Sequence, residues 1–283
     1  MNEIIIILLC IPLYVINSFC DKYISSKGYS GALYNALKFF VGSICFLPML
    51  FFDGARAFEF GAVICGSACG IMYAISKMII LKGYEQTSVA FMTFCHSAGM
   101  IVPCVIGHFF WQENLSFVAL VGILLTVFSA VLLKGGKEDK KGYSLLGVAI
   151  GTVVFLASGG VMMCQKFMGI YFPSQSVGAY NFYSFLVPFL IIGALGAFKK
   201  GEKGSAKKSL PFAAASALSL CIISFVMTSI ASTVPSVIMF PLFNGVGIVL
   251  VCIGSVFAFK EKMTLKKAIG IAVGLVGLYF INI

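Results

Sequence analysis

Ten apolar runs, each about as long as a membrane span, limit what this chain can fold into. A helix that crosses a bilayer needs about 20 predominantly apolar residues. The connections between the runs are short, and none has room for a soluble domain. The runs are Ile4–Phe19, Leu33–Phe52, Gly61–Leu81, Ser88–Phe110, Ser116–Leu133, Leu145–Cys164, Ser176–Ala197, Leu210–Ile230, Val234–Phe257 and Leu265–Ile281. The sequence therefore predicts an all-α membrane protein with ten transmembrane helices.

Composition excludes the main soluble classes. The chain is 60% hydrophobic and 11% charged, whereas soluble domains have about 45–50% apolar and about 25% charged residues. A soluble enzyme, a secreted disulfide scaffold and a nucleic-acid-binding domain are therefore not expected. The net charge of +10 comes from lysines in the short connections, which is typical of topology signals rather than of a phosphate-binding face.

The cysteines and the N-terminus add two further expectations. All ten cysteines lie within or beside apolar runs, and no CxxC is present. We interpret them as small buried hydrophobic residues and expect no metal site and no cofactor. The N-terminal run lacks a basic segment before it and a small-residue cleavage site after it, so we expect it to be a retained first span.

The chain repeats itself. A shift of 148 residues aligns Ser88–Leu133 with Ser236–Ile281 without a gap and with eight identities. Further back, Tyr34-Asn35 matches Tyr180-Asn181 at a shift of 146, and Cys20-Asp21-Lys22 matches Cys164-Gln165-Lys166 at a shift of 144. We therefore expect two repeats, residues 1–138 and residues 139–283, in one membrane domain.

The repeat carries a functional implication. Five spans is an odd number, so the second repeat must enter the bilayer in the opposite sense. Inverted repeats are a recurring plan of secondary transporters, in which two nearly equivalent halves exchange the side that is open. The repeat is therefore our main sequence-based indication of transport by alternating access.

Two copies of one short motif carry a resemblance to a known family. The pattern E-x-[LM]-[ST]-x5-G occurs near the end of each repeat, at Glu113, Leu115, Ser116 and Gly122 and at Glu261, Met263, Thr264 and Gly270. With ten spans in a five-plus-five arrangement, the chain resembles the EamA-like branch of the drug/metabolite transporter superfamily. The resemblance implies a central cavity lined by the first, third and fourth spans of each repeat. It also implies transport of amino acids, phosphorylated or nucleotide-linked sugars, or other small metabolites and drugs.

The resemblance and the charge pattern differ on two details. Sixteen lysines lie in the connections after the odd-numbered spans, against Arg56 and Lys166 in the alternate connections. The positive-inside rule then favours termini outside the cell, whereas the resemblance implies cytoplasmic termini. Relatives often carry a Pro in the fourth span of each repeat, but Pro103 and Pro241 are not at equivalent positions. Helix-breaking geometry is therefore expected to differ between the halves.

Acidic and basic residues lead to different expectations about the substrate. All ten acids, Asp21 included, lie at or beyond the predicted span ends, which disfavours cation–proton exchange through a carboxylate in the middle of the membrane. Lys77 lies inside the third span and Lys38 inside the second. Each could pair with a substrate carboxylate or phosphate in a cavity, or could extend its ammonium to the nearer interface.

His96 and Asn244 are further candidates for substrate binding. His96 lies inside the fourth span, and the shift of 148 equates it with Asn244 in the ninth. Two polar side chains at symmetry-related positions fit a site at the membrane midplane, and imidazole could also carry a coupling proton. The alternative is that each bonds a neighbouring helix across a packed interface.

A second group of polar residues recurs in both repeats. Asn17 and Gln165 are candidate substrate ligands, and Tyr34, Asn35, Tyr180 and Asn181 are candidate gates that close alternately. Helix caps and interface hydrogen bonds are the alternative for this group. We predict that Ser116 and Thr264 cap the fifth and tenth helices and that Glu113 and Glu261 are structural.

These observations lead to three hypotheses about function. The first is a secondary transporter of a small anionic or zwitterionic metabolite, coupled to an ion or proton gradient, in a bacterial plasma membrane. The second is an exporter of hydrophobic or aromatic drugs or amino acids that uses Phe and Met side chains. The third is a membrane enzyme or scaffold without transport, although no catalytic nucleophile constellation is present. Beyond the bilayer and a small-molecule substrate, the sequence leaves the oligomeric state open, a homodimer included.

Overall fold

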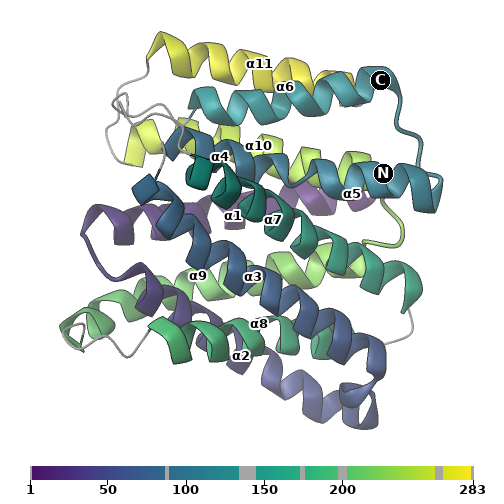
Figure 1. Ribbon diagram of the computed structural model, residues 1–283. Helices are drawn as coiled ribbons and strands as arrows, with labels where there is room; N and C mark the ends of the chain where they lie inside the picture. The colour runs from purple at the N-terminus through teal and green to yellow at the C-terminus, as the bar shows by residue number, and fades with distance from the viewer. Residues whose placement is uncertain are drawn as a thin grey trace. The chain divides into compact units, whose positions relative to one another are not determined.

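The structure, a computed structural model, describes residues 2–86, 89–133, 145–172, 176–196, 203–258 and 264–281. These residues form helices and connecting turns, with no strand among them. The elements are α1 (Asn2–Ser26), α2 (Gly31–Asp53), the short 3-10 helix η1 (Gly54–Phe58), α3 (Phe60–Gln86), α4 (Val89–Ala98), α5 (Ile101–Trp111), α6 (Phe117–Leu133), α7 (Leu145–Tyr171), α8 (Val177–Gly196), α9 (Lys203–Ser229), α10 (Ser236–Ala258) and α11 (Leu265–Ile281) (Figure 1).

The predicted all-α class and the ten apolar segments are confirmed. Seven helices are long and apolar enough to cross a membrane, and two shorter apolar stretches, Cys95–Trp111 and Phe117–Leu132, accompany them. The tenth predicted run coincides with α11. The prediction was wrong in treating the fourth run as one helix, because the chain leaves the α-helix at Gly99 and Met100 between α4 and α5. Pro103 explains the break, since it lacks an N–H to donate to Gly99 and fits the first turn of a new helix.

The second Pro acts differently. Pro241 lies inside α10, which stays continuous from Ser236 to Ala258. The two halves therefore differ in helix continuity, as their unmatched prolines predicted.

Three helix ends also differ from the sequence expectation. α1 continues to Ser26 and α7 to Tyr171, seven residues past the predicted ends at Phe19 and Cys164. α9 begins at Lys203, inside a segment that we expected to be a polar connection. Asp21 therefore lies inside α1, contrary to the expectation that it would lie beyond a span, and Lys166 lies inside α7 rather than in a connection.

Hydroxyl caps begin the helices where polar residues precede the apolar runs. Ser30 accepts a hydrogen bond from the backbone N–H of Leu33 at the start of α2. Ser116 and Thr264 accept the corresponding bonds at α6 and α11, at 3.1 and 3.3 Å. The predicted caps are confirmed, and each satisfies a backbone donor that has no partner within its helix.

The chain forms two compact units. One comprises Met1–Ile11, Ile79–Met163 and Thr233–Ile283, and the other comprises Pro12–Met78 and Cys164–Ser232. Each unit contains helices from both predicted repeats. The units therefore do not coincide with the halves 1–138 and 139–283, because each half contributes to both units.

In the first unit, α6 packs along α11, and the two lie side by side in Figure 1. A Cβ added to Gly122 would lie 2.6 Å from the carbonyl oxygen of Gly277, and the hydroxyl of Ser129 donates to the carbonyl of Gly270 at 2.7 Å. The repeat shift of 148 equates Gly122 with Gly270 and Ser129 with Gly277. These reciprocal contacts show that α6 and α11 run antiparallel to each other.

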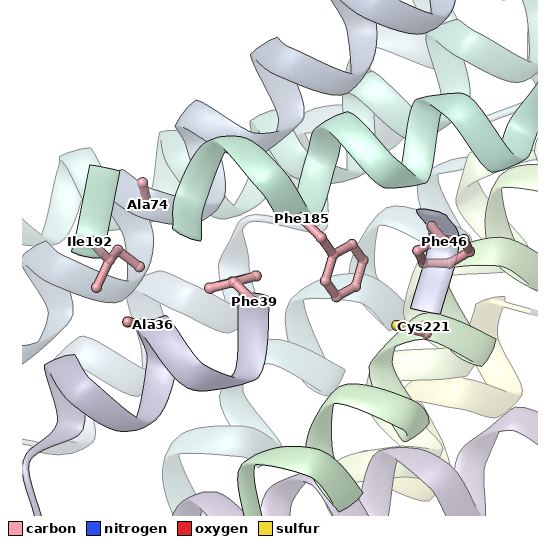
Figure 2. Packing of buried hydrophobic residues seen from close by; sticks show 7 residues of the cluster. All are labelled: Ala36, Phe39, Phe46, Ala74, Phe185, Ile192 and Cys221. Atoms are coloured by element: carbon pink, nitrogen blue, oxygen red, sulfur yellow. The ribbon is translucent and has the colours of Figure 1, made fainter. Parts of the chain in front are cut away.

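In the second unit, α2 and α8 form an equivalent pair. Phe185 of α8 lies between Phe39 and Phe46 of α2 (Figure 2), with ring centroids 5.8 and 5.6 Å away. The shift of 146 equates Phe39 with Phe185 and Phe46 with Ile192. Ile192 lies at the Phe39 end of this cluster (Figure 2). The pair is therefore antiparallel as well, and its aromatic residues form packed core.

Candidate functional site

A charged cluster lies within the second unit, where α1 meets α2. Asp21 lies on α1, and Tyr34 and Lys38 lie one turn apart on α2. Oδ1 of Asp21 accepts hydrogen bonds from the Tyr34 hydroxyl at 2.7 Å and from the Lys38 ammonium at 2.9 Å. The Lys38 ammonium also lies 5.1 Å from the centre of the Tyr34 ring, within the range of a cation–π contact.

Exposure is unequal across the Asp21–Lys38 ion pair. The Lys38 side chain is 0% exposed, whereas that of Asp21 is 36% exposed. Lys38 therefore does not extend to an interface, and its ammonium is held by a carboxylate that is still accessible. A buried charge is costly unless it is paired and hydrogen-bonded, so Asp21 is what permits an ammonium at this position.

Lys77 adds a second ammonium to the cluster. It lies on α3, is half-buried, and interacts electrostatically with both Asp21 and Lys38. The cluster therefore contains two ammonium groups and one carboxylate. Lys38 is bonded to Asp21, Lys77 interacts with the same acid electrostatically, and the set has a net positive charge.

Asn17 lies one turn before Asp21 on α1 and joins this region to α9. The Ser216 hydroxyl of α9 donates to the side-chain oxygen of Asn17. The Tyr23 and Phe212 rings stack nearby, with centroids 4.2 Å apart. The Asn17 contact is an interhelical hydrogen bond, which was the alternative for this residue.

A neutral polar cluster, formed by Gln165, Asn181 and Ser224, lies elsewhere in the second unit. The Gln165 amide on α7 donates to the Ser224 hydroxyl on α9 at 3.4 Å, and that hydroxyl donates to the side-chain oxygen of Asn181 on α8. All three side chains are buried. The repeat shifts equate Gln165 with Asp21 and Asn181 with Asn35, so the second repeat has a neutral, closed network where the first has charge.

The remaining candidate gates are buried beside these clusters. Tyr180 is fully buried, and its hydroxyl lies beside the thiol of Cys69 on α3. The backbone of Tyr180 approaches Gly66 so closely that a Cβ there would lie 2.5 Å from the Tyr180 carbonyl oxygen. Asn35 is buried next to Tyr34 on α2. Whether these residues gate stays a prediction.

His96 and Asn244 both belong to the first unit. His96 lies two residues before the end of α4, at the α4–α5 break, and its backbone carbonyl accepts bonds from Gly99 N–H at 3.3 Å and from the Ser158 hydroxyl at 2.9 Å. The Asn244 side chain is bonded within its own helix, to the carbonyl of Phe240 at 2.9 Å. Their shared role in binding stays a prediction.

Glu113 is structural, but it serves a different helix from the one that follows it. Its carboxylate accepts from the Ser236 backbone N–H at 2.7 Å and from the Ser236 hydroxyl at 3.4 Å. It therefore caps α10 of the other repeat, where a negative charge at the helix N-terminus is stabilising. Glu261 and Met263 lie outside the described residues.

The site residues that sequence reasoning missed are Asp21 and Ser224. Asp21 was placed beyond the first span, although it lies one helical turn after Asn17 and recurs in the repeat as Gln165. Those two signals could have identified it. Ser224 lies in an apolar run with no local signal. Among the residues that the structure describes, no group of three or more His, Cys, Asp or Glu side chains is arranged to hold a metal ion.

Comparison with known proteins bears on both fold and class. Residues 1–134 match the EamA-like transporter family. None of the curated proteins matches the chain. Among solved structures, 28 chains match. One of them is described only as a crystal structure of a protein. The match covers 99% of this chain and 96% of that chain, with a TM-score of 0.79 and 13% sequence identity. At that identity the likeness shows the fold alone, and it extends over both repeats.

Proposed function

We propose that this chain, whose residues 1–134 match the EamA-like transporter family, is a secondary active transporter of a small anionic or zwitterionic metabolite. It works by alternating access in a plasma membrane, for which we propose a bacterial one. The observation that carries the substrate class is the charged cluster, in which Lys38 is paired with the carboxylate of Asp21 and Lys77 interacts with both electrostatically.

The charge of the cluster supports this choice of substrate. Ionisable groups within membrane spans are rare and mark substrate or ion pathways. Lys38 is already paired with Asp21, so Lys77 is the ammonium whose charge remains to be balanced. A ligand carboxylate or phosphate provides that balance through a charge-assisted hydrogen bond.

The paired antiparallel helices support the mechanism. α6 with α11 and α2 with α8 are each related by the repeat shift and each lie within one unit. Symmetry-related halves are the arrangement on which alternating access is built. The α4–α5 break adds a discontinuous helix, a feature that transporters use at binding sites, and His96 lies beside it.

The positions of the aromatic residues give less support to the hypothesis of a hydrophobic-drug exporter. Phe39, Phe46 and Phe185 are buried against one another as core (Figure 2). They are therefore already engaged in packing between α2 and α8.

The test is a thermal-shift screen of purified protein against metabolites sorted by charge, followed by uptake of the best ligand into proteoliposomes. We expect anions or zwitterions to raise the melting temperature, since a ligand that binds only the folded state stabilises it. Lys77→Met should weaken binding about ten- to a hundredfold, which corresponds to the loss of one hydrogen bond to a charged group. Lys207→Met is the matched control, because Lys207 is exposed at the start of α9.

His96→Gln separately tests the candidate residue at the α4–α5 break. We expect reduced uptake with His96→Gln and normal uptake with His108→Gln, since His108 is exposed at the end of α5 and bonds the Glu113 carbonyl. Stabilisation by cationic or apolar compounds alone would favour the exporter hypothesis. Equal anion affinity in Lys77→Met and in wild type would overturn the proposed substrate class.

A further inference from the structure

The hydrogen bonds inside the charged cluster determine which of its polar groups a ligand can contact. Tyr34 and Lys38 both donate to Oδ1 of Asp21, so Oδ2 takes part in neither bond. Asp21 is 36% exposed, while Lys38 is fully buried behind it. A ligand that reaches the cluster therefore meets a carboxylate oxygen and the half-buried Lys77, and does not meet Lys38.

We infer that Asp21 determines how much negative charge a ligand of this cluster carries, and that it restricts the ligand to one unpaired negative charge, placed at Lys77. This inference rests on the proposed function and deepens it. Lys38 and Asp21 cancel each other, which leaves the single positive charge of Lys77. A ligand with one carboxylate is matched, whereas a second carboxylate would face Oδ2 of Asp21 without a counterion.

The neighbours of Asp21 include one further charged residue and several uncharged groups. Lys22 follows Asp21 directly on α1, and adjacent residues on a helix point about 100° apart. Tyr14, Cys20 and Tyr34 also interact electrostatically with Asp21, and these groups are uncharged at neutral pH in their ordinary state. The charges of Asp21, Lys38 and Lys77 are therefore the ones on which the inference rests.

Asp21→Asn is the variant that isolates the charge. Its amide oxygen can still accept from Tyr34 and Lys38, so the shape of the cluster is retained while one negative charge is removed. Lys38 stays buried, but its charge is no longer balanced, so the variant has two uncompensated positive charges and a ligand with two negative charges becomes the better match. Asp21→Asn combined with Lys38→Met returns the cluster to a single positive charge.

The experiment measures binding of succinamate and succinate to the purified full chain at pH 7.5. These acids are nearly the same size and carry one and two negative charges. We expect wild type to bind succinamate at least tenfold more tightly than succinate, Asp21→Asn to reverse that order, and the double variant to restore it. Circular dichroism and size-exclusion chromatography check that each variant is folded.

The outcomes separate this inference from the proposed function. An unchanged order of affinities in folded Asp21→Asn would overturn the role of Asp21, while anion-dependent uptake by wild type would leave the proposed function standing. If neither acid binds wild type or Asp21→Asn, the inference that the cluster admits small anions is also overturned. If the wider screen finds no anionic or zwitterionic ligand at all, the proposed function itself fails.

Discussion

Substitution of Gly122 by Ala tests the antiparallel contact between α6 and α11. A Cβ at this position would lie 2.6 Å from the Gly277 carbonyl oxygen and 2.9 Å from the backbone nitrogen of Ile281. Ordinary Cβ contacts lie between 3.4 and 4 Å. Both clashing atoms belong to the backbone of a helix and cannot rotate away, so the helices must separate.

The magnitude follows from two opposing effects. Overpacking of this kind costs about 1–3 kcal/mol, and a clash with fixed backbone lies in the upper part of that range. Ala in place of Gly inside a helix returns about 1 kcal/mol. We therefore expect Gly122→Ala to lower the free energy of unfolding by about 1–2 kcal/mol.

The assay is reversible unfolding in detergent, with Gly193→Ala as the matched control. A Cβ at Gly193 of α8 would meet the nearest ring atom of Phe189 at 3.8 Å, which is an ordinary contact. This control should be neutral or stabilising by up to about 1 kcal/mol. Gly277→Ala should behave like Gly122→Ala, because its Cβ would meet the Gly122 carbonyl at 2.7 Å. If Gly122→Ala is as stable as Gly193→Ala, the close packing of α6 on α11 is refuted.

Three further predictions concern stability, and the same unfolding assay measures each. Glu113→Gln should cost about 1 kcal/mol, because the N-terminus of α10 loses a charged acceptor; no change would mean that the carboxylate does not cap α10. Asp21→Ala should lower the free energy of unfolding by about 1–3 kcal/mol, and by more than Lys38→Met does. The loss of Asp21 leaves a fully buried ammonium unpaired, whereas the loss of Lys38 leaves a partly exposed carboxylate unpaired. The reverse order would contradict the burial of Lys38. Gly42→Ala should lower the free energy of unfolding by about 1–3 kcal/mol, because the added Cβ clashes with the Phe185 ring. In a double-mutant cycle, Phe185→Leu should relieve part of that loss. Strict additivity of the two changes would argue against the contact.

The positions of the helices could largely be predicted from the sequence. Apolar length alone located the segments, because each bilayer-crossing helix must satisfy its own backbone and present apolar side chains along its length. Errors occurred where polar residues continue a helix. α1 runs past Phe19 to Ser26 and α7 past Cys164 to Tyr171, and hydropathy cannot reveal such extensions, because the partners of Asp21 and Gln165 lie on other helices.

The repeat shift predicted more than helix positions. It equated Gly122 with Gly270, and the odd number of spans in each repeat predicted that the halves are inverted. The structure adds the register, in which Gly122 meets Gly277 and Ser129 meets Gly270. A shift between repeats states which residues correspond, but it does not state which residues touch, and only the packed structure provides those contacts.

The sequence by itself determined the class of the molecule, its ten apolar segments, its internal repeat and the caps at Ser116 and Thr264, since these depend on local composition and on short-range hydrogen bonding. The tertiary structure decided which charges meet. Lys38 has no acid near it in the sequence, and only the packing of α2 against α1 brings its ammonium to 2.9 Å from Asp21. Glu113 likewise reaches α10 rather than α6. Such pairings join residues far apart in the chain, so the free energy that selects them arises only when the helices are assembled.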